Sequence, residues 1–101
     1  MKLNAEQKRF ITDIIKGKID KGIFFVRFDR VTFAVRRETQ NSAKIGWSIH
    51  SVSDGKFRPK TGAYVALTRC NMPIENIGND PDYALDNLML RLRDTAEMLQ
   101  R

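Results

Sequence analysis

Cysteine and histidine each occur only once in this chain, and proline occurs three times. A lone cysteine, Cys70, excludes a disulfide within the chain, and a lone histidine, His50, excludes metal sites built from several histidines. No apolar run approaches the roughly 18–20 residues that span a bilayer. Residues 1–10 are polar and lack the apolar stretch of a signal peptide. We therefore expect a cytoplasmic protein that does not enter a membrane.

Recognisable catalytic motifs are also missing. A nucleophile needs a neighbouring base and an orienting group, and the sequence around Cys70 and His50 has no such pattern, so we interpret Cys70 as a buried thiol. The six glycines are scattered, which excludes a glycine-rich phosphate loop or a dinucleotide fingerprint. The acidic residues between positions 75 and 86 are explained by loop solvation and helix capping. We predict a protein that is not an enzyme and uses no metal or cofactor.

The charge is unevenly distributed along a chain of single-domain length. The 101 residues carry 18 Lys+Arg and 12 Asp+Glu, a net charge of +6, and 42% of them are hydrophobic, as in globular proteins. Residues 16–69 hold twelve Lys+Arg and four Asp+Glu, or +8. Residues 1–15 hold three and two (+1), and residues 70–101 hold three and six (−3). This asymmetry indicates a surface for an anionic partner, the alternative being a basic protein that binds nothing anionic.

Hydrophobic spacing predicts the first three elements. Asn4 and Gln7 form a capping box that opens a helix over residues 4–16, and Gly17 is placed to end it. Strands over residues 22–28 and 31–37 have their apolar residues at even and at odd positions, respectively. A two-residue turn at Asp29-Arg30 reconciles these parities, because it places six side chains on one face: Phe24, Val26, Phe28, Val31, Phe33 and Val35. The pair lacks the Gly or Asn typical of a type I′ turn.

The remaining elements complete an α+β domain. We predict a polar loop over residues 38–43, a third strand over residues 44–52 and a helix over residues 59–70 that opens at Pro59. A final helix over residues 81–100 follows the Asp80-Pro81 start signal. Residues 71–79 contain Pro73 and Gly78 and are predicted to be irregular. The prediction is a single α-β-β-β-α-α domain over residues 1–101, with a three-stranded antiparallel meander covered on one face by helices.

A basic stretch before the second helix is the strongest candidate site. Lys56, Arg58 and Lys60 flank Phe57 and lead into a helix start, whose free N–H groups favour anions. The full set of predicted partner-binding residues is Lys56, Arg58, Lys60, Arg36, Arg37, Lys44, Phe57 and Arg69. In the alternative interpretation, Phe57 belongs to the core and the lysines only solvate a loop.

Residues 54–69 resemble a signature of small accessory proteins of tailed phages. In those proteins a strand is followed by Asp-x-Phe, a basic pair, Gly, Ile/Val-Ala and Arg. The residues that match in kind here are Asp54, Phe57, Arg58, Lys60, Gly62, Val65, Ala66 and Arg69, whereas Pro59 and Ala63 depart from the pattern. The resemblance implies a phage-encoded protein acting in the cytoplasm of an infected bacterial cell.

The order α-β-β-β-α, with basic residues opening the second helix, also resembles the double-stranded-RNA-binding domain. Lys56, Arg58 and Lys60 stand where that domain has its basic cluster, but Asp29-Arg30 replaces its loop between the first two strands.

We therefore predict a small nucleic-acid-binding protein. The alternative is an inhibitor or modulator that binds an acidic host protein, in host takeover or anti-defence. Leu90, Met98 and Tyr83 lie off the main apolar stripe and suggest a homodimer through the last helix.

Overall fold

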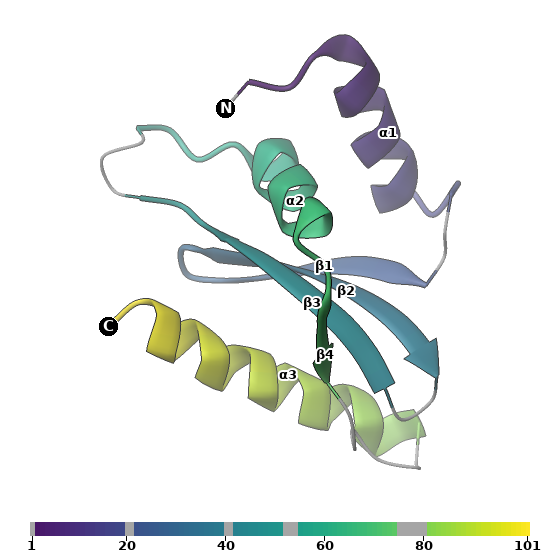
Figure 1. The fold of residues 1–101 in the computed structure, drawn as a ribbon, viewed down its shortest axis with the longest axis vertical. Helices are drawn as coiled ribbons and strands as arrows, with labels where there is room; N and C mark the ends of the chain where they lie inside the picture. Colours follow the sequence, from purple (N-terminus) through teal and green to yellow (C-terminus); the bar gives the residue numbers. More distant parts are fainter. Residues whose placement is uncertain (1, 20–21, 40–41, 52–54, 75–80) are drawn as a thin grey trace.

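The computed structural model of the chain describes residues 2–19, 22–39, 42–51, 55–74 and 81–101. These residues form one α+β domain, which confirms the predicted class (Figure 1). The sheet has four antiparallel strands in the order β1-β2-β3-β4, one more than predicted. In chain order the elements are α1 (Ala5–Ile15), β1 (Ile23–Phe28), β2 (Val31–Thr39), β3 (Ser42–Ile49), α2 (Pro59–Thr68), β4 (Met72–Ile74) and α3 (Pro81–Leu99).

The first hairpin has the predicted register. Phe28 pairs with Val31, Val26 with Phe33 and Phe24 with Val35, so the six apolar side chains share one face. Asp29 has φ +54° and is the one non-glycine residue with a positive φ in the described chain. A type I′ turn needs positive φ at both central residues, so the turn is of another type. The N–H of Arg30 donates to Oε1 of Gln100 (3.3 Å), which ties the turn to the segment after α3.

The main core lies between the sheet and α3. Val31, Phe33, Val35 and Ile45 from the sheet pack against α3 residues, and all of them are buried. The partners from α3 are Leu88, Leu92 and Ala96.

Helices cover both faces of the sheet, which corrects the prediction of a single covered face. Figure 1 shows α3 below the sheet and α1 and α2 above it. A second, smaller cluster, of Leu3, Ile11 and Ala63 with Phe25 partly buried against it, lies on the side of α1 and α2. The prediction failed because the upper face carries few large apolar residues, and a face of this composition is typical of solvent exposure.

The upper face accommodates α2 because its side chains are small. Thr32, Ala34, Gly46 and Ser48 line up across β2 and β3, with Thr32 opposite Ser48 and Ala34 opposite Gly46. A Cβ atom built on Gly46 would lie 2.2 Å from the carbonyl oxygen of Ala66 and 2.5 Å from the amide nitrogen of Cys70. The backbone at the end of α2 therefore rests directly on the backbone of β3.

One strand was not predicted, and several strand boundaries differ from the predictions. Residues 72–74 form the short edge strand β4, since Ile74 is buried in the core and Pro73 is tolerated on an edge. Strand β2 extends to Thr39 and β3 begins at Ser42, which shortens the predicted loop over residues 38–43. Strand β3 ends at Ile49, and residue 52, its predicted end, lies outside the described residues.

The predicted helix boundaries are close to the observed ones. Asn4 caps α1 with the complete capping box to Gln7, and Gly17 follows the helix with φ +72°. Pro59 occupies the first turn of α2. Helix α3 begins at Pro81, whereas Asp80, the predicted cap, lies outside the described residues. Among the helices in the described ranges, none has the length and apolar character needed to span a membrane.

The contact at Gly46 leads to a stability prediction. Gly46→Ala should destabilise the fold by about 3 kcal/mol or more, because the new methyl group would meet backbone atoms that can move only if α2 moves away from the sheet. The free energy of unfolding, measured by urea denaturation, tests this.

Gly17→Ala is the matched control. It places the same methyl group at a position with no atom within 4 Å, but with φ +72°. Its cost should be about 1 kcal/mol, from the backbone conformation alone. Equal losses for the two variants would show that α2 is not held by close contact at Gly46.

Candidate functional site

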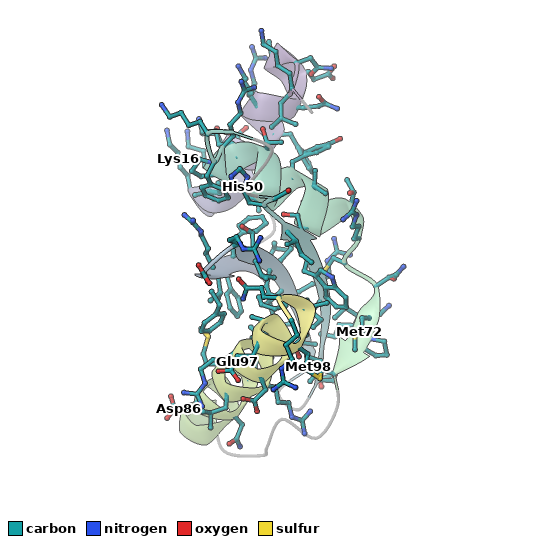
Figure 2. The ribbon with its side chains drawn as sticks, turned by 90° about the vertical axis from the view of Figure 1, so that its left-hand side faces the viewer. Lys16, His50, Met72, Asp86, Glu97 and Met98 are labelled. Carbon is teal, nitrogen blue, oxygen red and sulfur yellow. The ribbon has the colours of Figure 1, made fainter. Side chains whose placement is uncertain are left out.

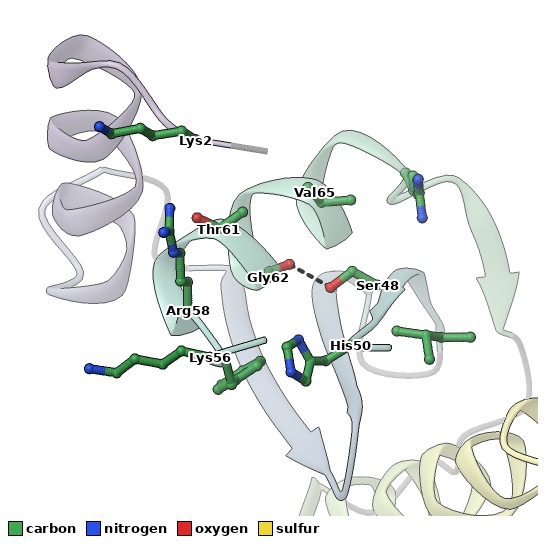
Figure 3. Close-up of a pocket in the computed structure, with 11 residues that line it drawn as sticks. Lys2, Ser48, His50, Lys56, Arg58, Thr61, Gly62 and Val65 are labelled. Atoms are coloured by element: carbon green, nitrogen blue, oxygen red, sulfur yellow. Dashed lines mark hydrogen bonds between the residues drawn. The ribbon is translucent and has the colours of Figure 1, made fainter. Parts of the chain in front are cut away.

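A cleft of about 610 Å³ lies between α2 and the end of β3. Figure 3 shows it in close-up, with α2 forming one wall and Ser48 and His50 of the β3 segment the other. The described lining residues are Lys2, Ser48, Ile49, His50, Lys56, Phe57, Arg58, Thr61, Gly62, Val65 and Arg69. The cleft therefore combines both ends of α2 with residues distant from it in sequence.

Helical periodicity explains how α2 forms its wall. Arg58, Thr61, Gly62, Val65 and Arg69 recur at intervals of three and four residues, which places them along one stripe. Buried Ala63 and Ala66 lie on another side of the helix, where small side chains permit the close approach to the sheet. The stripe thus carries a cation at each end, and the cleft runs between them.

Lys2 completes the cleft from the N-terminal segment. Its neighbour Leu3 is buried against Ala63 of α2, and Nε2 of Gln7 lies 3.3 Å from the hydroxyl of Tyr64. These contacts hold the start of α1 beside α2. Sequence reasoning missed Lys2 because it lies 54 positions before Lys56, and the one signal in the sequence was the apolar Leu3 before the helix cap.

The electrostatics of the cleft favour an anion. Lys2, Lys56, Arg58 and Arg69 are the charged residues among those described as lining it, and none of the lining residues is acidic. The N-cap residue of α2, Arg58, makes no side-chain hydrogen bond to the helix, and the first turn contains no acidic residue. The positive end of the α2 dipole therefore adds to the field of the four cations.

Phe57 anchors the segment that leads into α2. Its ring meets that of His50 edge-on at 5.4 Å, and the guanidinium carbon of Arg27 lies 3.7 Å from its centroid. Nε2 of His50 is 2.9 Å from the carbonyl oxygen of Gly55. The hydroxyl of Ser48 donates to the carbonyl oxygen of Gly62 (2.9 Å). Half-buried Phe57 therefore fixes the positions of Lys56 and Arg58 on either side of it.

The other predicted site residues lie outside the cleft. Lys60 is exposed in the first turn of α2 and is not one of the lining residues. Arg36 and Lys44 face each other across β2 and β3 near Cys70, which is beyond the far end of α2. Lys44 also pairs with Glu38, at 3.3 Å. Arg37 is on the opposite face of β2, with Val35. The structure thus brings Lys56, Phe57, Arg58 and Arg69 together in one cleft. The predicted residues that lie outside it are Arg36, Arg37, Lys44 and Lys60.

The charge follows the layers of the fold. Residues 2–18 carry five Lys+Arg and two Asp+Glu, and residues 55–69 carry four and none. Residues 86–101, in and after α3, carry three of each and are neutral. Figure 2 shows Lys16 and His50 at the end of the molecule formed by α1 and α2, and Asp86 and Glu97 on α3 at the other. The positive surface is therefore on the α1 and α2 side of the sheet.

Cys70 is placed as a structural thiol. It is half-buried, and its Sγ lies 3.3 Å from the carbonyl oxygen of Lys44 and 3.6 Å from that of Ala34. Burial raises the pKa of the thiol above its ordinary value of 9.0, although the charges of Arg36 and Lys44 act in the opposite direction. In the described ranges, no three His, Cys, Asp or Glu residues are grouped so as to hold a metal ion.

The raised pKa of Cys70 predicts slow alkylation. At pH 8 the folded protein should react with iodoacetamide more slowly than the urea-unfolded chain, because less of the thiol is ionised and the sulfur is half-buried. Since folding raises the pKa of Cys70, the protonated thiol contributes to the free energy of unfolding at pH values below the pKa of the unfolded chain. This contribution is lost as the pH rises through the pKa of the folded protein. Mass spectrometry of the alkylated chain over pH 7–10 measures the rate, and equal rates for folded and unfolded protein would contradict the assignment.

Comparisons with models of protein families, with curated proteins and with solved structures give no match to this chain.

Proposed function

We propose that this protein binds nucleic acid through the cleft between α2 and β3 and performs no catalysis. The observation that carries the proposal is the gathering of four cations in one cleft, none of whose described lining residues is acidic. They come from the N-terminal segment (Lys2), the segment before α2 (Lys56 and Arg58) and the end of α2 (Arg69). Lys and Arg side chains and a helix N-terminus are common donors to phosphate oxygens.

Such contacts predict how the protein discriminates. The cleft offers cations and hydroxyls, which can contact the phosphate backbone. The ring of Phe57 already contacts Arg27 and His50, so we do not count it as a base-stacking residue. Affinity should therefore depend strongly on salt and little on base sequence. As part of the same proposal, and on the basis of the resemblance of residues 54–69 to accessory proteins of tailed phages, we infer that this activity belongs to an infected bacterial cell.

Charge reversal in the cleft tests the proposal. A K56E/R58E variant should bind a fluorescein-labelled 20-base-pair duplex at least about tenfold more weakly at 100 mM salt, because two phosphate contacts are lost and two repulsions are added. The slope of log K against log salt should become shallower by about 2. Fluorescence anisotropy measures both quantities, on two duplexes of unrelated sequence.

R93E/R101E is the control, since it makes the same change in net charge at two exposed positions in and after α3. It should weaken binding much less than K56E/R58E. Equal loss in the two variants would mean that net charge alone attracts the duplex and that the cleft is not the site. Absence of binding by the unaltered protein at low salt would overturn the proposal. An acidic protein captured from a nuclease-treated bacterial lysate, and lost in K56E/R58E, would then favour the alternative function.

A further inference from the structure

A second cleft, of about 450 Å³, lies on the same side of the sheet between the end of α1, β1 and the start of α2. Its described lining contains two polar residues, Arg27 and Thr32, and is otherwise apolar. The apolar residues are Ile14, Ile15, Ile23, Phe24, Phe25, Val26, Phe57, Pro59 and Ala63. Small-molecule sites have this volume range and this composition of an apolar lining with a few fixed polar groups. The first cleft, between α2 and the end of β3, is called the basic cleft below. Among the described lining residues, Phe57 alone belongs to both clefts.

Arg27 is held in place at this cleft. Its Nε donates to the carbonyl oxygen of Asp29 (2.7 Å), and its guanidinium lies over the ring of Phe57. The four N–H donors on the two Nη atoms have no hydrogen-bond partner among the residues that the structure describes. The hydrogen bond from Nε and the stacking of the guanidinium on Phe57 hold the group in place, and they leave its two Nη atoms available to bind a carboxylate in a bidentate manner. Because the side chain is already ordered, little conformational entropy would be lost on binding.

The remaining surroundings fit an anion with an apolar body. No acidic residue occurs among the described residues of the lining. Ile15 is 53% exposed, so the cleft presents apolar surface to solvent. Thr32, the cross-strand neighbour of Arg27, is 5% exposed, and its hydroxyl has no hydrogen-bond partner among the residues that the structure describes. Apart from Arg27 and Thr32, the described residues that line the cleft are apolar, so they suit the hydrocarbon part of a ligand.

We propose that this cleft binds a small amphipathic carboxylate, with its head group on Arg27 and its apolar body along Ile14, Ile15, Phe25 and Ala63. Burial of the apolar body supplies the main part of the affinity, and the guanidinium selects the carboxylate over neutral or cationic head groups. The proposal is independent of the nucleic-acid function, because the four cations of the basic cleft are absent from this lining.

Titration of the ¹⁵N-labelled protein with decanoate, followed by amide chemical shifts, tests the proposal. Decanoate should shift the amides of residues 14–15, 23–27 and 63, and should bind about tenfold more tightly than decanol, the probe with the same chain and no charge. In R27Q the difference between the two probes should fall to less than about threefold. In R30Q, which removes a charge from the turn of the same hairpin, it should be unchanged.

I15E provides a second variant that tests the apolar contact. Ile15 is more than half exposed, so the substitution is compatible with folding, and the new carboxylate should repel decanoate and abolish the shifts. The amide spectrum of each variant without probe checks the fold. Equal affinity for decanoate and decanol, shifts confined to the basic cleft, an unchanged preference in R27Q, or no binding of either probe would each overturn the proposal. Duplex binding by R27Q and I15E is measured separately, so the two proposals can fail independently.

Discussion

The contact between α2 and β3 at Gly46 is the constraint on which both clefts depend. Because the upper face of the sheet carries a glycine, an alanine and two hydroxyl residues along this path, the helix rests on backbone rather than on a layer of large side chains. Its position is thereby fixed at both ends, at Gly46 by backbone contact and at Ser48 by a hydrogen bond to Gly62. The space left on either side of α2 forms the two clefts, with Phe57 in the wall of each.

Much of the fold could be predicted because its determinants are local. The change of parity at Asp29-Arg30 fixed a hairpin register, and the Asn4 and Gln7 capping box fixed the start of α1. The second covered face could not be predicted, because packing at such close range requires small residues and leaves no hydrophobic period to detect. Strand β4 was missed for a related reason. Three residues are too few to show alternation, and Pro73 argued against a strand, although an edge position tolerates it.

The candidate site was predictable to the extent that its residues are neighbours in sequence. Lys56, Phe57 and Arg58 come from one stretch, and helical spacing carries the same stripe to Arg69. Lys2 depends on the docking of α1 against α2, which only the tertiary structure shows. Arg36 and Lys44 illustrate the reverse case, since a strand pair places them together near Cys70, at the far end of α2. Charge along a sequence thus indicated a basic surface, but not which cations share a cleft.

The layered distribution of charge has a consequence for how the molecule approaches a polyanion. The positive excess of residues 2–18 and 55–69 lies on one side of the sheet, and α3, with two Lys+Arg and four Asp+Glu, lies on the other. The centre of charge is therefore displaced from the centre of mass along the direction that crosses the sheet. The field of a distant polyanion therefore exerts a torque that turns α2 toward it before any contact forms. The orientation of the protein during diffusion would depend on how charge is distributed between the two sides of the sheet, so it would survive the loss of any single cation.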